Sequence, residues 1–370
     1  MKRWLKNGGR EPSLSLFVLW FERGRRSLRS DAALEAIAKA SEDRVPNLVL
    51  YNYPSFSGAF SALFAHLFHT RHSLPSLILP FSSVPSLAFR VEELCIQGLE
   101  TCYFLDFLPQ KDFLFNLSRQ SKCKVIGFDH RKSVLRKIPS ASDCPDNITI
   151  NVNLEKSSSS AVYEYFASKH EDTKISCDEV PSLVDSKDKG RVELILKYIE
   201  DGDLRRWSLP GIRAFNIGLS EWRSRFNCVS NPYMYKQLLK LSAEDLIAKG
   251  NSYLSARQNS ANKLLGKVFR VRLGRGFYGE CLGVRVDGNS NLSDEIGKLL
   301  SVKSAATGLR PIGAVIFMQR NNLKMCLRST DRATDTSEVA KAYGGGGSPS
   351  SSSFMIRMDE YNKWISGNLS

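Results

Sequence analysis

A repeated pattern of short apolar runs, separated by enough chain for a helix, limits the fold of this sequence more than any other feature. The first run, Asn47 to Tyr53, precedes a Pro-Ser turn and an apolar stretch at helical spacing, Gly58 to His69. A strand, a tight turn and a helix in this order usually begin a parallel α/β sheet. Similar runs follow at 74–81, 100–107 and 123–130. The pattern therefore predicts an N-terminal α/β domain with a parallel sheet.

Two of the predicted strands end in an aspartate, Asp106 and Asp129. The carboxyl ends of parallel strands meet at one edge of a sheet, where ligands bind. We therefore expect both aspartates to face one crevice, together with the turn after Tyr53. Either aspartate taken alone is more often an N-cap or a turn residue, and this interpretation stays open.

A second, smaller α/β domain is predicted by the length of the chain and by a second series of elements. Single hydrophobic cores stop growing near about 250 to 300 residues, and this chain has 370. Strands are expected at 267–273, 277–286, 313–319 and 323–329, with a helix at 293–305. We expect a basic extension and helix at 1–44, the parallel-sheet domain at 45–231, a helical connector at 232–262 and the second domain at 263–370.

The charge of the chain favours anionic partners. The formal net charge is +14 and the pI about 9.4, which predicts a positive field around the molecule. Between residues 255 and 330, 13 Lys/Arg stand against four Asp/Glu. Aromatic residues that are able to stack bases alternate there with arginines, although each aromatic alone more often packs in a core. These residues are Arg270, Arg272, Arg275, Arg285 and Arg328 with Phe269, Phe277 and Tyr278.

The cysteines and histidines restrict the chemistry. The eight cysteines form no Cys-x-x-Cys pair, which favours reduced thiols in an intracellular protein. With only five histidines, any metal has to rely mainly on carboxylates.

The beginning of the chain indicates a location without deciding it. Its longest apolar run, Leu14 to Phe21, is far shorter than the roughly 20 residues that span a bilayer, so no transmembrane segment is expected. Residues 1–30 carry eight Lys/Arg against two Glu. This composition suits either a transit peptide for a mitochondrion or chloroplast or a basic tail of a cytoplasmic protein.

A glycine-rich segment near the end of the chain, Lys341 to Met358, predicts a phosphate site. Its four glycines let backbone N–H groups approach an anion closely, and Arg328 and Ser329 lie in the preceding strand. A glycine-serine linker looks similar, but an apolar strand at 354–358 and an amphipathic helix follow.

Taken together, these segments resemble the DHH phosphoesterase superfamily, in its oligoribonuclease-like branch with a DHH-associated C-terminal domain. Asp106 stands at the second motif's strand end, and Asp129-His130-Arg131 is similar to the Asp-His-His motif. The segment from Glu200 to Pro210 is similar to the fourth motif, an acidic pair before a Leu-x-x-Trp-x-Leu-Pro run. The Leu-Arg-Ser strand at 327–329 and the glycines at 345–347 resemble the DHH-associated domain.

The resemblance implies two divalent cations, usually manganese, which activate a water against a phosphodiester. The implied catalytic and metal-ligating residues are Asp106, Asp129, His130, Asp201 and Asp203. The implied substrate-binding residues are Arg131, Arg328, Ser329, Gly345, Gly346, Gly347 and Ser348.

Four positions depart from the family pattern. Asn52 and Ser57 replace a histidine and an aspartate of the first motif, Arg131 replaces a histidine, and Ser348 replaces the histidine after the glycines. We therefore expect a catalytically impaired protein that binds a nucleotide or a nucleic acid in the cleft between its domains, with Arg131 gripping a phosphate in place of metal. The alternatives are an active manganese-dependent phosphodiesterase for short oligonucleotides or cyclic dinucleotides, and a structural partner subunit.

Overall fold

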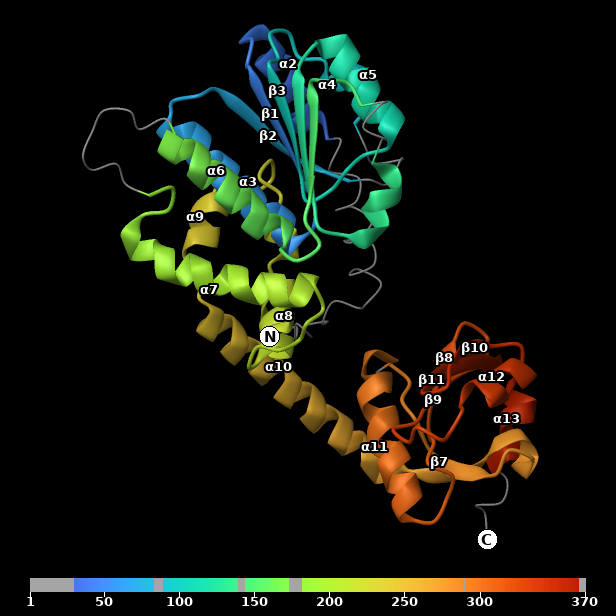
Figure 1. The fold of residues 1–370 in the computed structure, drawn as a ribbon. Helices are drawn as coiled ribbons and strands as arrows, with labels where there is room; N and C mark the ends of the chain where they lie inside the picture. The colour runs from blue at the N-terminus through green and yellow to red at the C-terminus, as the bar shows by residue number, and fades with distance from the viewer. Residues whose placement is uncertain (1–29, 83–88, 139–143, 173–181, 289, 366–370) are drawn as a thin grey trace, which may run out of the picture. The chain divides into compact units, whose positions relative to one another are not determined.

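The computed structural model describes residues 30–82, 89–138, 144–172, 182–288 and 290–365, and the predicted transit peptide or tail lies outside them. The chain divides into two compact units, residues 1–250 and 251–370 (Figure 1). The four-segment division predicted above stays a prediction.

Unit 1 is built on a five-stranded parallel sheet with the order β2-β1-β3-β4-β5, as the strand-turn-helix pattern predicted. The side chains of the central strands are almost all buried, because helices cover both faces of the sheet. The strands are β1 (Asn47–Asn52), β2 (Ser76–Phe81), β3 (Thr101–Leu105), β4 (Lys124–Asp129) and β5 (Ile148–Val152).

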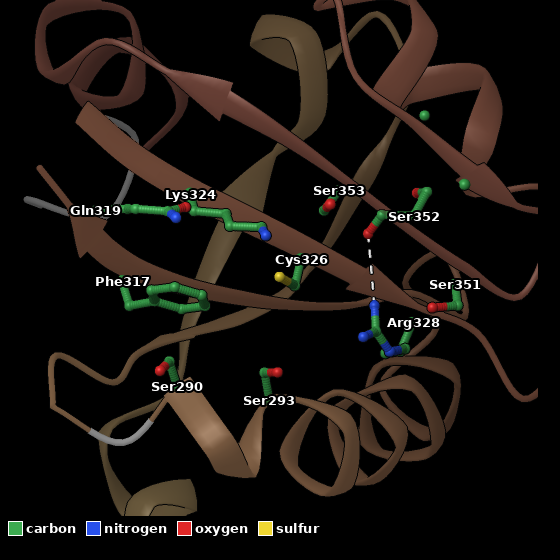
Figure 2. A pocket seen from close by; sticks show the side chains of 12 residues that line it. Ser290, Ser293, Phe317, Gln319, Lys324, Cys326, Arg328, Ser351, Ser352 and Ser353 are labelled. Carbon is green, nitrogen blue, oxygen red and sulfur yellow. Dashed lines mark hydrogen bonds between the residues drawn. The ribbon is translucent and has the colours of Figure 1, made fainter. Parts of the chain in front are cut away.

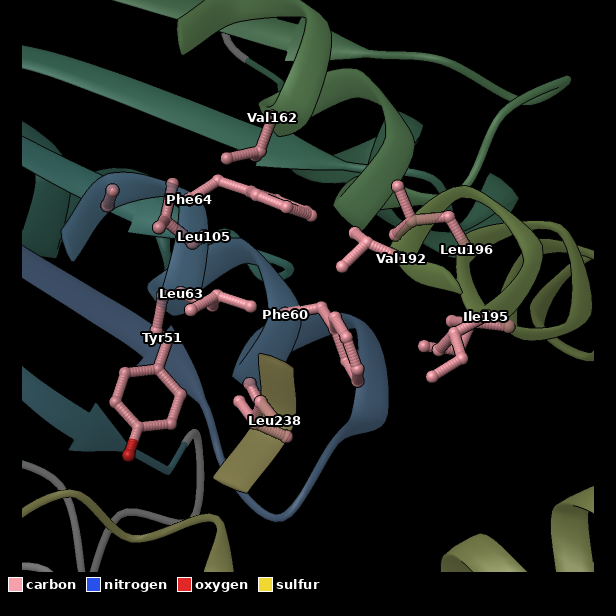
Figure 3. Close-up of a cluster of buried hydrophobic side chains, with 14 of the residues drawn as sticks. Tyr51, Phe60, Leu63, Phe64, Leu105, Val162, Val192, Ile195, Leu196 and Leu238 are labelled. Carbon is pink, nitrogen blue, oxygen red and sulfur yellow. The ribbon is translucent and has the colours of Figure 1, made fainter. Parts of the chain in front are cut away.

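Two layers of helices enclose the sheet of unit 1 (Figure 1). One face packs on α2 (Asp31–Glu42), α4 (Val91–Leu94) and α5 (Lys111–Ser121). The other face packs on a larger aromatic core, in which Phe60 and Phe64 meet Val162 and Val192 (Figure 3). The helices of this side are α3 (Phe56–Arg71), α6 (Ser158–Asp172), α7 (Ser186–Asp203), α8 (Ile212–Ser220) and α9 (Met234–Leu239).

The turn between β1 and α3 is unusually tight. The Ser55 side chain caps α3 by accepting a hydrogen bond from the Gly58 N–H. A Cβ atom at Gly58 would lie 2.1 Å from the Asn52 carbonyl oxygen, so only glycine fits there. This close approach brings the beginning of α3 to the carboxyl end of β1.

Unit 2 contains a six-stranded mixed sheet with the order β10-β11-β9-β8-β7-β6. Only β7 and β8 are parallel, and the other pairs are antiparallel. The strands are β6 (Phe269–Arg272), β7 (Glu280–Arg285), β8 (Gly313–Gln319), β9 (Asn322–Arg328), β10 (Gly346–Ser348) and β11 (Ser351–Ile356). The helices are α11 (Ser293–Ala306), α12 (Ser337–Ala342) and α13 (Met358–Ile365). The predicted fold class, two α/β domains of which the first has a parallel sheet, is confirmed.

Helix α10 (Ala243–Leu264) covers most of the predicted connector and contains the boundary between the units. Helix α7 continues without interruption through Gly202 to Asp203. In the described parts of the chain, no helix is long and apolar enough to cross a membrane.

Candidate functional site

The candidate site of unit 1 lies at the carboxyl ends of β1, β3 and β4. Strand β1 is flanked by β2 on one side and β3 on the other, and open α/β sheets bind ligands where the strand order reverses in this way. Asp106, directly after β3, accepts hydrogen bonds from Asn52 Nδ2 at 3.0 Å and from Ser55 Oγ at 2.5 Å. The predicted meeting of Asp106 with the turn after Tyr53 is therefore confirmed.

Asp106 itself adopts a left-handed backbone conformation, with φ of 66°. Residues other than glycine rarely take this conformation, and it is concentrated at functional sites. Its side chain is almost completely buried.

The Arg131 guanidinium grips the Asp129 carboxylate through two hydrogen bonds. Nε donates to Asp129 Oδ1 at 2.8 Å, and Nη2 donates to Oδ2 at 2.7 Å. The backbone N–H groups of His130 and Arg131 also donate to Oδ1. We call the two side-chain bonds the Arg131–Asp129 fork. It engages both oxygens of a carboxylate that has no exposed surface.

The fork also joins the two aspartates. Nη2 of Arg131 donates a further bond of 2.7 Å to the backbone carbonyl of Asp106. Asp129 and Asp106 therefore lie close together, and a guanidinium links them; that they face a ligand crevice stays a prediction.

His130 lies between Asp106 and α6. Its Nδ1 is 3.3 Å from Asp106 Oδ1 and 2.9 Å from Ser158 Oγ. Burial alone lowers the pKa of His130, but hydrogen bonding to Asp106 and the charges of Asp106, Asp203 and Asp129 raise it above its usual value. Burial likewise opposes ionisation of Asp106, yet His130 and Arg131 hold its pKa below the usual range. The site therefore contains a carboxylate beside an imidazole that readily takes up a proton.

The two acidic residues at the end of α7 have different environments. Asp201 accepts hydrogen bonds from the Ser208 N–H at 3.0 Å, the Ser208 hydroxyl at 2.5 Å and the Leu209 N–H at 3.4 Å. It holds the turn after α7 in place and does not contact the other predicted ligands. Burial opposes its ionisation, but these bonds lower its pKa.

Asp203 is the member of the acidic pair that belongs to the site. Burial and the charge of Asp106 raise its pKa to about 7, although His130 partly opposes this shift. Its Oδ2 is buried and has no hydrogen-bond partner among the described residues. An unpaired carboxyl oxygen in this position is a costly feature for a folded protein.

The arrangement does not suit the two manganese ions that the resemblance implies. Metal ligands must offer free oxygen or nitrogen atoms, but both oxygens of Asp129 are held by Arg131. Asn52 directs its amide N–H toward Asp106, and Arg131 adds a positive charge. Within the described ranges, no group of three or more His, Cys, Asp or Glu side chains is placed to hold a metal ion.

Two contributors to this site were missed by sequence reasoning. Ser55 binds Asp106 while capping α3, and the Pro-Ser turn before an apolar helix is a signal that could have identified it. Ser158 contacts His130 from the beginning of α6. The run of four serines at 157–160 gives no sign of which one reaches the histidine.

Unit 2 carries a separate hollow of about 440 Å³ on its sheet, next to the glycine-rich segment (Figure 2). Arg328 and Lys324 on β9 line it, together with Gly346 and Gly347. Arg328 Nε donates to Asp294 Oδ1 at 3.0 Å, and Nη1 donates to the Ser352 carbonyl at 3.5 Å. Arg328 therefore lines the same hollow as two of the glycines, and the phosphate site predicted there stays a prediction.

The remaining predicted substrate residues of unit 2 lie outside the lining of this hollow. The Ser329 hydroxyl is buried and donates to the Pro311 carbonyl, and the Gly345 N–H donates to Ala340. Gly346, Gly347 and Ser348 form β10, which pairs with β11 at the edge of the sheet. The expected cradle of glycine N–H groups is therefore replaced by an edge strand, because β11 begins at Ser351, three residues earlier than predicted.

The two units define an α/β protein, and structural comparison finds solved proteins to which it is similar at TM-scores below 0.5. One similar solved structure is an exopolyphosphatase-related protein from Bacteroides fragilis, at 13% identity and a TM-score of 0.33, over 91% of this chain and 95% of the other. Another is RecJ in complex with Mn²⁺ from Thermus thermophilus. It is 12% identical with a TM-score of 0.35, over 92% of this chain and 55% of RecJ.

A third similar structure is the pGpG-specific phosphodiesterase PggH from Vibrio cholerae. It is 12% identical with a TM-score of 0.36, over 86% of this chain and 95% of PggH. No protein-family model and no curated protein matches the sequence.

Proposed function

We propose that this chain binds a phosphate-bearing ligand, the phosphate of a nucleotide or nucleic acid, on a phosphoesterase scaffold without two-metal hydrolysis. The Arg131–Asp129 fork is the observation that carries this proposal. Two-metal hydrolysis requires carboxylates that bridge or hold the cations, and here the carboxylate of Asp129 is already neutralised from within the chain.

Arg131 is also able to contact a ligand. Its side chain is 41% exposed, and its Nη1 donates to none of the residues that the structure describes. A guanidinium with a free edge is well suited to a phosphate, which accepts charge-assisted hydrogen bonds.

The charges of the site favour an anion most when Asp203 is protonated. Arg131 balances Asp129, and Asp203 is a further carboxyl group of the site, with a pKa of about 7. We therefore expect phosphate binding to strengthen as the pH falls through about 7, because Asp203 then loses its negative charge. The gain ends at the lower pH at which the phosphate, or the Asp106 carboxylate beside His130, takes up a proton.

Calorimetry with AMP as the probe, in the presence of a metal chelator, tests the proposal. We expect the full chain to bind AMP under these conditions. Arg131→Lys keeps the charge but cannot form the fork, so it should weaken binding by about 10-fold or more. Arg275→Lys in unit 2 is the matched control and should leave the affinity unchanged.

The competing functions give different results. Loss of AMP binding on chelation, or manganese-dependent cleavage of a dinucleotide that Asp129→Ala abolishes, would establish the active phosphodiesterase instead. A chain that binds neither manganese nor any phosphate ligand would fit the structural partner subunit.

A further inference from the structure

The segment that follows α7 in unit 1 carries an exposed tryptophan. We call residues 204–210 the α7 turn, and Trp207 lies within it, 51% exposed. Among the residues that the structure describes, the Trp207 ring stacks on no other ring, and its Nε1 donates no hydrogen bond. Burial of a ring of this size would favour folding, so the fold gains nothing from leaving Trp207 outside the core.

The backbone of the α7 turn is strained at two positions. Arg205 has a φ of 55° and Trp207 a φ of 52°, both in the left-handed region that residues with a Cβ atom rarely adopt. Strained residues of this kind persist only where the surrounding structure imposes them, and they are concentrated at ligand sites. The chain therefore accepts a cost in conformational energy at Trp207 itself.

Hydrogen bonds to Asp201 impose this conformation. The Arg206 N–H donates to the backbone carbonyl of Asp201, and the Ser208 N–H donates to its carboxylate, both at 3.0 Å. Trp207 is therefore fixed between two residues that bind the same aspartate. A backbone fixed in this way needs no ordering when Trp207 meets a ligand, which lowers the entropic cost of binding.

The α7 turn is tied to the candidate site at two points. It begins directly after Asp203, whose carboxyl group interacts with the charge of His130. Further along the turn, Arg206 Nη2 donates to the Glu155 carbonyl at 2.7 Å. Glu155 lies three residues before Ser158, whose hydroxyl is 2.9 Å from His130 Nδ1. The exposed ring therefore lies on a segment that borders the candidate site.

We infer that Trp207 is a specificity residue of unit 1, which stacks on the base of a nucleotide whose phosphate binds Arg131. This inference rests on the function proposed above and adds a planar aromatic base to the ligand. Every base has a π-face, so stacking on Trp207 favours a nucleotide over a sugar phosphate or free phosphate without selecting one base. Arg131 and Trp207 then divide the ligand between them, one binding its charge and the other its ring.

The test compares AMP with ribose 5-phosphate, which has the same phosphate and sugar but no base, by calorimetry on the full chain with a metal chelator. The parent should bind AMP more tightly. Trp207→Ala should weaken AMP binding by about 5- to 150-fold, which corresponds to the loss of one stacked base, and leave ribose 5-phosphate unchanged. Trp207→Phe should retain most of the AMP affinity. Tyr233→Ala removes another exposed aromatic of unit 1, 67% exposed, and should affect neither ligand.

Tryptophan fluorescence provides a second measurement, which reports the contact itself. AMP stacked on Trp207 should quench the emission of the parent, whereas ribose 5-phosphate should not. The chain has five tryptophans, so Trp207→Phe serves as the reference that removes one of them. AMP should no longer quench the emission of this variant, although it still binds.

The outcomes separate this inference from the function on which it rests. Equal affinities of the parent for AMP and ribose 5-phosphate, or AMP binding that Trp207→Ala leaves unchanged, would overturn the role of Trp207 while the phosphate site stands. Equal weakening of both ligands by Trp207→Ala would also overturn it, because the residue would then act on the phosphate site as a whole. A parent chain that binds neither ligand would overturn the proposed function and this inference together.

Discussion

The two units of this protein use their charges in opposite ways. Residues 31–250 contain 27 Lys/Arg and 27 Asp/Glu, whereas unit 2 has 17 against nine. In the site of unit 1, the buried carboxylate of Asp129 is paired with a guanidinium from the same chain, in the Arg131–Asp129 fork. On strand β6 of unit 2, Arg270 and Arg272 both approach Glu280 and have exposed side chains. Buried pairs are expected to matter for stability, and exposed cations for binding.

Breaking the Arg131–Asp129 fork should change the free energy of unfolding more than any other substitution considered. Arg131→Met leaves the carboxylate of Asp129, which has no exposed surface, without its guanidinium, and should lower the free energy of unfolding by about 3 kcal/mol. Urea denaturation measures this. Arg275→Met in unit 2 removes an exposed ion pair of similar geometry and should lower the free energy of unfolding far less. Equal costs for the two variants would remove the contrast between the units.

A smaller change in stability, with opposite signs at two neighbouring positions, is expected at the end of α7. Folding raises the pKa of Asp203 to about 7, so the stability that its protonated form provides is lost as the pH rises from about 4 to about 7. Asp203→Asn avoids this loss and should be more stable than the parent at pH 8, by on the order of 2 kcal/mol.

Asp201→Asn should have the opposite effect on stability. Folding lowers the pKa of Asp201, so its carboxylate stabilises the protein above pH 4, and the variant should be about 1 to 2 kcal/mol less stable at neutral pH. Thermal unfolding of both variants at pH 5 and pH 8 provides the measurement. The same sign for both at pH 8 would contradict the different environments of the two carboxyl groups.

The smallest change in the free energy of unfolding is expected for a substitution in unit 2. Replacing Arg270 and Arg272 by Gln should change the free energy of unfolding by no more than about 0.5 kcal/mol, because both side chains are largely exposed. The denaturation experiment used for Arg131 applies here too. A large loss would show that these arginines are structural and not available to a ligand.

Most of the fold could be predicted because its strands are short apolar runs followed by turn residues. The strand β5 was missed, since Thr149 and Asn151 interrupt its apolar pattern at the edge of the sheet. Strand β10 was missed because three residues of the type Gly-Gly-Ser have no strand propensity, and pairing with β11 alone makes them extended.

The site was predictable in its location and less so in its contacts. Strand-end aspartates indicated the crevice, and the sequence showed that Arg131 stands where a histidine is expected. That Arg131 turns back onto Asp129, two residues earlier, depends on side-chain rotamers that no periodicity encodes. Asp201 and Asp203 have different roles because of the turn after α7. Backbone N–H groups of this turn donate hydrogen bonds to Asp201.

The Arg131–Asp129 fork also changes how the site depends on its surroundings. A cation that is part of the chain has no dissociation constant, so its occupancy is fixed when the protein is made and does not follow the supply of free metal in the compartment. In the function proposed above, the site exchanges the higher charge of a divalent ion for a permanent one. A protein of this kind would report the concentration of its ligand, undisturbed by changes in metal availability.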